Sequence, residues 1–153
     1  MQLQAGFSTQ PEPRTMPNCI MKAKSEKRLD KVNIDEIILD TLNLRRAFVG
    51  DQIDDCRDLS SLFYLLPTQK GYLVNWDHQK TVWDYLFGKQ CFNMKPDSTT
   101  LIFTEPLFNF SSIQEGLSEM FFEEYGFSRV LRTHAPDLSC YQVQTQEQTV
   151  CKV

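Results

Sequence analysis

The stretch that most constrains the fold is Gly71–Gly88, which reads GYLVNWDHQKTVWDYLFG and contains both tryptophans. Its first residues predict a short extended run over Tyr72–Val74, and Asn75 or Asp77 is suited to cap a helix after it. The apolar residues that follow recur at helical spacing: Trp76, Val82, Trp83, Leu86 and Phe87. The polar residues expected on the other side are His78, Gln79, Lys80 and Asp84. With Gly88 as its stop, the stretch predicts a strand followed by an amphipathic helix.

The tryptophan pair allows two interpretations. Aromatic residues on one helical face usually belong to a core, although they also form recognition surfaces. No catalytic constellation accompanies them in this stretch. The pattern therefore predicts an α/β domain and leaves function to other evidence.

Composition narrows the class of protein. The chain has 153 residues, 41% of them hydrophobic and 12% aromatic, which is enough for the core of one domain. A formal net charge of -4 disfavours direct nucleic-acid binding through phosphate neutralisation. No signal peptide and no apolar run of about eighteen residues are found, so we expect no membrane span. Five widely spaced cysteines are expected to be reduced thiols: Cys19, Cys56, Cys91, Cys140 and Cys151.

The N-terminal part predicts a hairpin and a helix. Two short strands, Leu3–Ser8 and Arg14–Ile20, flank a turn that contains Pro11 and Pro13. The basic residues between 22 and 31 are interpreted as a solvated loop, with a nucleic-acid site as the alternative. Leu29–Leu44 has an apolar face for an amphipathic helix, which either docks on its own domain or offers a groove-binding face to a partner.

Further strands and a short helix are expected along the chain. Ala47–Gly50 is a short apolar run, and Asp51–Asp58 predicts a short polar helix. Leu62–Leu66 and Arg129–Thr133 are predicted strands. Thr100–Thr104 is an almost wholly apolar strand, which predicts a parallel sheet covered on both faces.

A second amphipathic helix is predicted from Ser111 or Ser112 to about Tyr125, with Glu115 placed to complete a capping box on Ser112. Its predicted inner face comprises Ile113, Leu117, Met120 and Phe121, and its acidic outer face Glu115, Glu119, Glu123 and Glu124. Glu119 and Glu123 lie one turn apart, as paired catalytic acids can. No metal or substrate partner is evident, so a solvated face is the preferred interpretation.

No pattern of catalytic or metal-binding residues stands out. His78 and His134 have no cysteine, serine or carboxylate at a motif spacing, and the common hydrolase and phosphate-binding motifs are missing from the sequence. We therefore expect no catalytic, cofactor-binding or metal-binding residues and no enzyme activity. Ala135–Tyr141 predicts the start of a helix that Pro136 interrupts. Residues 142–153 are polar and predict a disordered tail.

Several short strings resemble the first half of actin and its relatives: Ala5–Phe7, Pro13–Arg14, Val49–Asp51, Gly71–Asp77, Thr104–Glu105 and Phe122–Glu123. Longer strings resemble one of the actin-related proteins in particular: Pro17–Ser25, Lys70–Trp76, Val82–Tyr85, Asn109–Glu115 and Phe122–Tyr125. The resemblance implies a partial actin-like ATPase domain of the ribonuclease H-like type, a mixed sheet flanked by helices without its first strand. Residues 1–141 would form the N-terminal half of that fold, with 29–45 as an insert in the small subdomain.

The same resemblance implies a nuclear protein, with the cytoplasm as a further location, and a subunit of a remodeller that exchanges a core histone for its Z-type variant. Its implied partners are a motor ATPase and a zinc-finger HIT-type subunit, with no direct nucleic-acid, membrane or small-molecule partner. An actin-type ATP-binding protein and a filament-forming cytoskeletal relative remain the alternatives.

Two departures from the family bear on catalysis. The chain is expected to begin after the first phosphate loop and to end before the second. The hairpin lysine that faces phosphate in actin corresponds to Gln4, and the glutamine that orients the attacking water corresponds to Ala135. A neutral amide lacks the charge, and a methyl group cannot hold water. We therefore expect neither ATP hydrolysis nor a cofactor.

Overall fold

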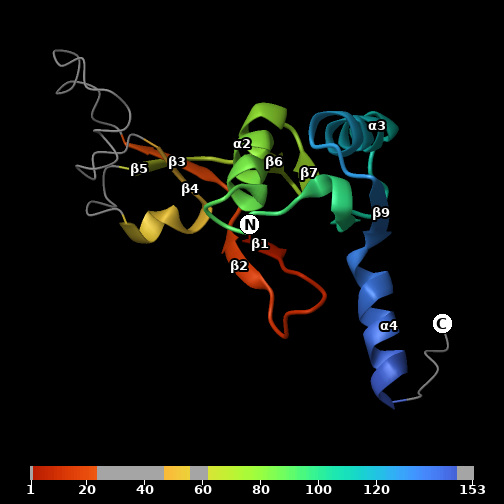
Figure 1. Cartoon of the computed structure of the whole chain (residues 1–153). Coiled ribbons are helices and arrows are strands. Elements are labelled where there is room, and N and C mark those ends of the chain that lie inside the picture. The colour runs from red at the N-terminus through yellow and green to blue at the C-terminus, as the bar shows by residue number, and fades with distance from the viewer. Residues whose placement is uncertain (1, 24–46, 56–61, 148–153) are drawn as a thin grey trace, which may run out of the picture. The chain divides into compact units, whose positions relative to one another are not determined.

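The computed structural model describes residues 2–23, 47–55 and 62–147 (Figure 1). The chain divides into two compact units, Met1–Phe92 and Asn93–Val153, which are described separately. The predicted helix Leu29–Leu44 and the predicted insert 29–45 lie outside the described residues, as do Cys56 and Cys151.

The first unit opens with the predicted hairpin. Strands β1 (Gln2–Ala5) and β2 (Arg14–Pro17) pair antiparallel, from Gln2 opposite Pro17 to Ala5 opposite Arg14. Strand β1 is shorter than predicted because the segment after it, which contains two prolines, forms turns, and β2 is shorter because it ends at Pro17. The chain then leaves this sheet at Asn18 and starts a second one at Ile20.

The second sheet holds the core of this unit. It is antiparallel in the order β4 (Ala47–Val49), β3 (Ile20–Ala23) and β5 (Leu62–Leu65). The predicted strand Leu62–Leu66 is confirmed as β5, whereas β3 was not predicted, since the sequence placed the end of a strand at Ile20 and a basic loop from Lys22. The short 3-10 helix η1 (Gly50–Asp55) adds Ile53 to the core. The buried members of the cluster are Cys19, Met21, Phe48 and Leu62.

A small hairpin leads into the central helix. Strands β6 (Thr68–Gln69) and β7 (Tyr72–Leu73) are joined by Lys70 and Gly71, both at positive φ, as a two-residue hairpin loop requires. Helix α2 (Trp76–Phe87) then begins where predicted, with the Asn75 side chain accepting the hydrogen bond of the His78 amide at 2.9 Å.

Gly88 ends α2 as predicted, and one other prediction about this helix needs correction. Gly88 ends the helix in an extended conformation, φ -69°, and a Cβ there would lie 2.6 Å from the carbonyl oxygen of Asp84. Its small size, rather than a left-handed backbone, is therefore what the position requires. Gln79 was assigned to the solvent side and is buried with Val82 and Leu86, because residues three and seven positions apart share one helical face.

The second unit is built on a parallel strand pair, as predicted. Strands β8 (Thr100–Glu105) and β9 (Arg129–His134) pair from Thr100 opposite Arg129 to Glu105 opposite His134, after the short 3-10 helix η3 (Pro96–Ser98). The prediction that β8 is covered on both faces is wrong for the described residues. Ile102 and its partner Leu131 are 57% and 54% exposed, because no described strand or helix of the second unit covers that face.

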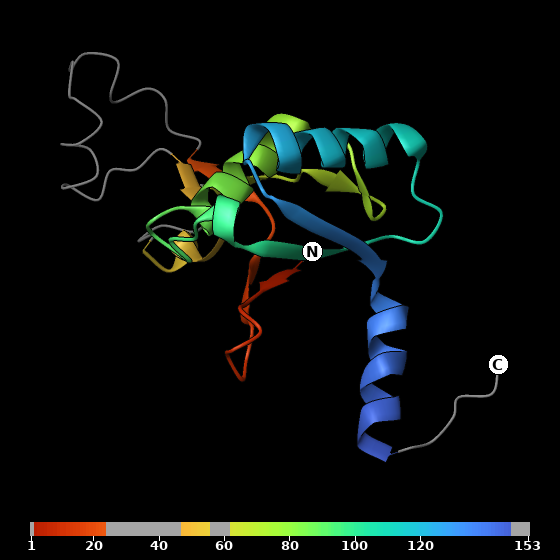
Figure 2. The same ribbon diagram turned by 45° about the vertical axis from the view of Figure 1, so that its right-hand side comes forward.

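Helix α3 covers the other face of this pair (Figure 2). It spans Ser111–Glu119 and continues as a π-helical turn, η4 (Met120–Glu124), so the predicted helix over this region is confirmed. Phe121 packs against Phe103 of β8, with ring centroids 4.9 Å apart, and against Phe127 at 6.1 Å. Leu117, Phe121 and Phe127 are buried and form the centre of the unit.

The start of α3 differs from the predicted capping box. Phe110 occupies the N-cap position without a side-chain cap, and Ser112 lies inside the helix. The carboxylate of Glu105 instead fixes this region, since it accepts hydrogen bonds from Asn109 at 2.9 Å and Gln114 at 3.0 Å. A tertiary contact from β8 thus orders the loop before the helix.

Helix α4 (Ala135–Glu147) runs past Tyr141, where the sequence predicts that the ordered chain ends. Pro136 does not interrupt it, because a proline in the first turn removes no intrahelical hydrogen bond. The residues from Asp137 to Glu147 contain neither glycine nor proline, which permits the helix to continue. Residues 148–153 of the predicted tail lie outside the described residues.

The described strands form four sheets. Three of them are antiparallel, and the β8–β9 pair is parallel. In the implied actin-like fold a first strand would lie next to the hairpin, and among the described strands none besides β1 and β2 belongs to that sheet. Among the described helices, none has the length and apolar character needed to cross a bilayer.

Candidate functional site

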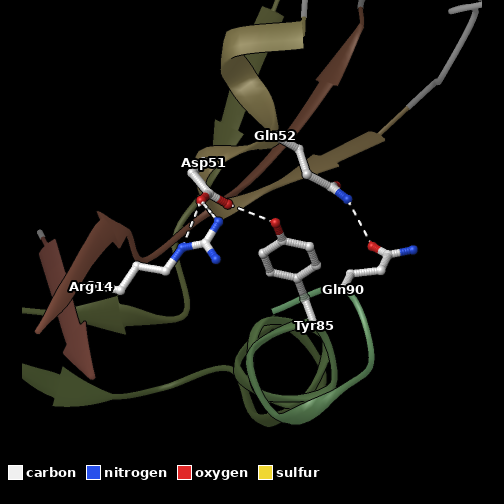
Figure 3. A network of polar contacts seen from close by, with 5 residues as sticks. All are labelled: Arg14, Asp51, Gln52, Tyr85 and Gln90. Atoms are coloured by element: carbon white, nitrogen blue, oxygen red, sulfur yellow. Dashed lines mark hydrogen bonds and ion pairs between the residues drawn. The ribbon is translucent and has the colours of Figure 1, made fainter. Parts of the chain in front are cut away.

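The most connected polar cluster of the first unit centres on Asp51. This residue lies in the first turn of η1, between Arg14 of β2 and Tyr85 of α2 (Figure 3). One carboxylate oxygen, Oδ2, accepts hydrogen bonds from Arg14, with Nε at 3.0 Å and Nη2 also in contact. The other, Oδ1, accepts the Tyr85 hydroxyl at 2.7 Å. Both carboxylate oxygens are therefore engaged by protein groups.

A second set of hydrogen bonds, made by the neighbouring residue Gln52, lies beside the first. Gln52 accepts the Val49 amide through its side-chain oxygen at 3.0 Å, and its amide nitrogen donates to Gln90 at 3.1 Å. Figure 3 shows Gln52 and Gln90 next to the Asp51–Tyr85 pair, with Gln90 just past the end of α2. Helix η1 is thus joined to α2 through Tyr85 and to the segment after α2 through Gln90.

The electrostatics of the cluster favour a charged Asp51 and a neutral Tyr85. Burial acts to raise the pKa of Asp51, but the hydrogen bonds from Tyr85 and Arg14 outweigh it and hold that pKa below its ordinary value. Burial together with the hydrogen bond to Asp51 raises the pKa of Tyr85 to about 12. The hydrogen bond to Asp51 also raises the pKa of Arg14.

This arrangement is suited to holding structure, not to acid–base chemistry. A catalytic base at neutral pH needs a pKa near the working pH, whereas the pKa of Asp51 is lowered from a value that is already acidic. Burial raises the pKa of the Cys91 thiol nearby, so that thiol stays protonated and weakly nucleophilic. We interpret the cluster of Arg14, Asp51 and Tyr85 as a polar joint between the hairpin, η1 and α2.

A buried amide pair lies elsewhere in the same unit. Asn18 and Gln79 are 3% and 4% exposed, and the Asn18 amide nitrogen donates to the Gln79 side-chain oxygen at 3.1 Å. Within the described residues, Asn18 Oδ1 and His78 Nδ1 are buried without a hydrogen-bond partner. The pair links the segment between β2 and β3 to α2.

Sequence reasoning missed both clusters for different reasons. Asp51 is 37 residues from Arg14 and 34 from Tyr85, so no local spacing connects them. Gln79 had a signal, because it precedes Val82 by three positions and Leu86 by seven. A polar residue on an apolar stripe is a candidate for a buried hydrogen bond.

The other candidate residues fall in separate places. Glu119 and Glu123 are exposed on the outer face of α3 and η4, as predicted for a solvated face. His134 contacts Asp137 at 3.0 Å on the surface. Cys19, Cys91 and Cys140 are free thiols, and the described residues contain no group of three metal-ligating side chains. Gln4 is exposed on β1, and Ala135 is exposed at the start of α4.

The two predicted docking regions have different outcomes. The face over 34–42 lies outside the described residues. In the region Trp76–Phe87, Trp76, Trp83 and Phe87 are all half-buried, while Val82 and Leu86 are buried. The tryptophans therefore lie at the edge of the core. The centre of that helical face, Val82 and Leu86, belongs to the core and not to a recognition surface.

Comparison with known proteins confirms the resemblance drawn from the sequence. A sequence model of the actin family matches residues 1–152. Actin-related protein 6 of Drosophila melanogaster is 46% identical over 146 residues, covering 94% of this chain and 32% of that protein. The actin-like protein ARP6 of Cryptococcus neoformans is 40% identical over 79% of this chain and 21% of its own length. Actin-related protein 6 of Arabidopsis thaliana is 31% identical over 97% of this chain and 32% of its own length.

The chain thus spans about a third or less of the length of these curated relatives. The mixed α/β content and the parallel β8–β9 pair agree with part of an actin-like fold.

Proposed function

The chain belongs to the actin family, and on this premise we propose that it acts as a non-catalytic structural subunit of a nuclear chromatin-remodelling complex. In this proposal the complex exchanges a core histone for its Z-type variant. The observation that carries the proposal is the similarity, over 94% of this chain, to a relative named actin-related protein 6. The strings Pro17–Ser25 and Asn109–Glu115 contribute to the resemblance in both units.

The non-catalytic part of the proposal rests on two positions. Gln4 stands where the resemblance places a phosphate-facing lysine, and its neutral amide cannot offset the charge of a phosphate group. Ala135 stands where the resemblance places the glutamine that orients the attacking water. Positioning and charge stabilisation supply most of phosphoryl-transfer catalysis, so both replacements act against hydrolysis.

We further propose that the partners of the chain are proteins, namely a motor ATPase and a zinc-finger HIT-type subunit, and that it resides in the nucleus and also in the cytoplasm. The net charge of -4 supports protein contacts over contacts with the phosphates of nucleic acid. The exposed apolar pair Ile102 and Leu131 offers a surface that protein contacts can cover.

Affinity purification of the tagged chain from nuclear extract tests the assembly. Remodeller subunits, including a motor ATPase, are expected to co-purify. The variant Met21→Asp serves as a misfolded control, because it places a carboxylate at a fully buried position of the first unit. If wild type and Met21→Asp both recover only chaperones, the proposed subunit role is wrong.

Nucleotide binding tests the non-catalytic part separately. Equilibrium binding of labelled ATP with and without magnesium is expected to give no saturable signal for this chain. Micromolar, magnesium-dependent affinity would favour the alternative of an actin-type ATP-binding protein. Co-sedimentation with actin filaments would favour the cytoskeletal alternative, and we expect none.

A further inference from the structure

An open groove runs along α3 in the second unit. It has a volume of about 560 Å³ and is lined by one stripe of the helix, from Ser111 to Glu123, and by Arg132 of β9. Twelve helical steps correspond to about 18 Å at 1.5 Å per residue. The groove is therefore long enough to lie against three turns of a second helix.

The charges of the groove are arranged in a row. Glu115, Glu119 and Glu123 line it at successive intervals of four residues, which places their carboxylates about one helical turn apart. Their like charges repel each other along the helix. Among the described residues, no cation forms an ion pair with Glu119 or Glu123.

Among the described residues that line the groove, Arg132 is the one cation, and it is hydrogen-bonded to α3. The Arg132 guanidinium donates to the main-chain oxygen of Gln114 at 3.3 Å, in the first half of α3. Glu119 ends α3 and Glu123 lies in η4, so both residues follow in later turns than Gln114. The surroundings reinforce the negative sign, since residues 93–147 hold eight Asp and Glu against three Lys and Arg, a net charge of -5.

An exposed aromatic ring lies among these charges. Phe122 lines the groove and is 47% exposed, whereas its neighbour Phe121 is 2% exposed and anchors the core. The π-helical turn that carries Phe122 is closed by the Tyr125 amide donating to Met120 at 3.1 Å. A single large apolar side chain in a charged groove provides the buried contact that a docking segment needs.

We propose that this groove binds a basic amphipathic helix of a partner protein. Lysine or arginine side chains four residues apart on that helix would match the row of Glu115, Glu119 and Glu123. An apolar side chain between them would pack on Phe122. Complementary charge selects a cationic segment and repels an acidic one or a nucleic acid. This inference rests on α3 and β9 and does not require the remodeller assignment.

The test uses the full chain and a fluorescent lysine–leucine amphipathic peptide, with binding followed by anisotropy. The wild-type chain is expected to bind this peptide with an affinity that falls as the salt concentration rises. It is expected not to bind a glutamate–leucine peptide of the same pattern. The double variant Glu119→Lys/Glu123→Lys is expected to weaken binding about tenfold or more and to reduce the salt dependence. Phe122→Ala is expected to weaken binding with its salt dependence unchanged.

The matched control is Asp97→Lys, an exposed charge reversal in η3 that does not line the groove. It is expected to leave the affinity within about twofold of wild type. Circular dichroism verifies that each variant keeps its fold, as expected for exposed side chains. Equal binding of both peptides, no binding by wild type, or an equal loss in Asp97→Lys overturns the proposal. An unchanged affinity in Phe122→Ala also overturns it.

Discussion

Tyr85 donates a 2.7 Å hydrogen bond to Asp51 across 34 residues of sequence, and this contact joins the central helix to η1. Arg14 engages the other carboxylate oxygen, so one acidic side chain links three elements of the first unit. The joint makes the stability of this unit depend on the ionisation of Asp51 and of Tyr85.

Replacing Asp51 should remove an acid-sensitive part of the stability. The pKa of Asp51 is lowered in the folded chain, so its contribution is present above the unfolded value of about 4 and is lost as pH falls through the folded value. We expect Asp51→Asn to cost about 1–2 kcal/mol near neutral pH and to flatten the loss of stability in acid. Urea unfolding at several pH values measures both effects. Asp54→Asn is the exposed control, and an equal cost there would contradict the joint.

Tyr85 should resist ionisation at alkaline pH. Its pKa of about 12 lies above the ordinary value of 10, so the stabilising neutral form is fully present below pH 10 and is lost as pH rises toward 12. Absorbance titration of the wild type against Tyr85→Phe isolates this residue among the five tyrosines. Asp51→Asn is expected to shift the titration of Tyr85 toward pH 10, because the accepting charge is gone. A titration of Tyr85 at its ordinary value in wild type would show that the hydrogen bond does not form.

Replacing Gln79 by leucine should destabilise the first unit although leucine is more apolar. The change keeps a similar volume at a buried site and leaves the Asn18 amide without its acceptor. An unpaired buried amide costs about 1–3 kcal/mol, and chemical denaturation measures the loss. The control is Gln69→Leu on exposed β6, where a change within about 0.5 kcal/mol is expected. Equal stabilities of the two variants would mean that the buried pair contributes nothing.

The adjacent residues Phe121 and Phe122 should differ sharply when each is replaced by alanine. Phe121 contacts Phe103 and Phe127 and is almost fully buried, so Phe121→Ala is expected to cost about 3–5 kcal/mol. Phe122 is about half exposed and should cost less than about 1 kcal/mol. Thermal unfolding of both variants gives the comparison. Similar costs would contradict the assignment of Phe121 to the core and Phe122 to the surface.

Local patterns predicted the elements of this chain well where the signal lies within a few residues. The hairpin turn with its prolines, the Asn75 cap of α2 and the apolar run of β8 each depend on neighbours in sequence. The inner face of the helix over α3 and η4 was also predicted, because helical spacing alone places Leu117 and Phe121 together.

The missed features depend on contacts over long separations. The predicted capping box on Ser112 does not form. Glu105 at the end of β8 instead accepts hydrogen bonds from Asn109 and Gln114. The prediction that β8 is covered on both faces was wrong because an apolar run indicates only a preference for burial, and the described part of the second unit covers one face of the strand.

The sequence by itself determined the family, the N-terminal hairpin, the strands β5, β8 and β9, and the helices over α2 and over α3 with η4. Only the tertiary structure decided which polar residues meet, because the partners of Asp51 and Gln79 lie 34 to 61 residues away. Propensity and periodicity act over one or two helical turns, whereas a hydrogen bond between distant residues depends on how whole elements pack.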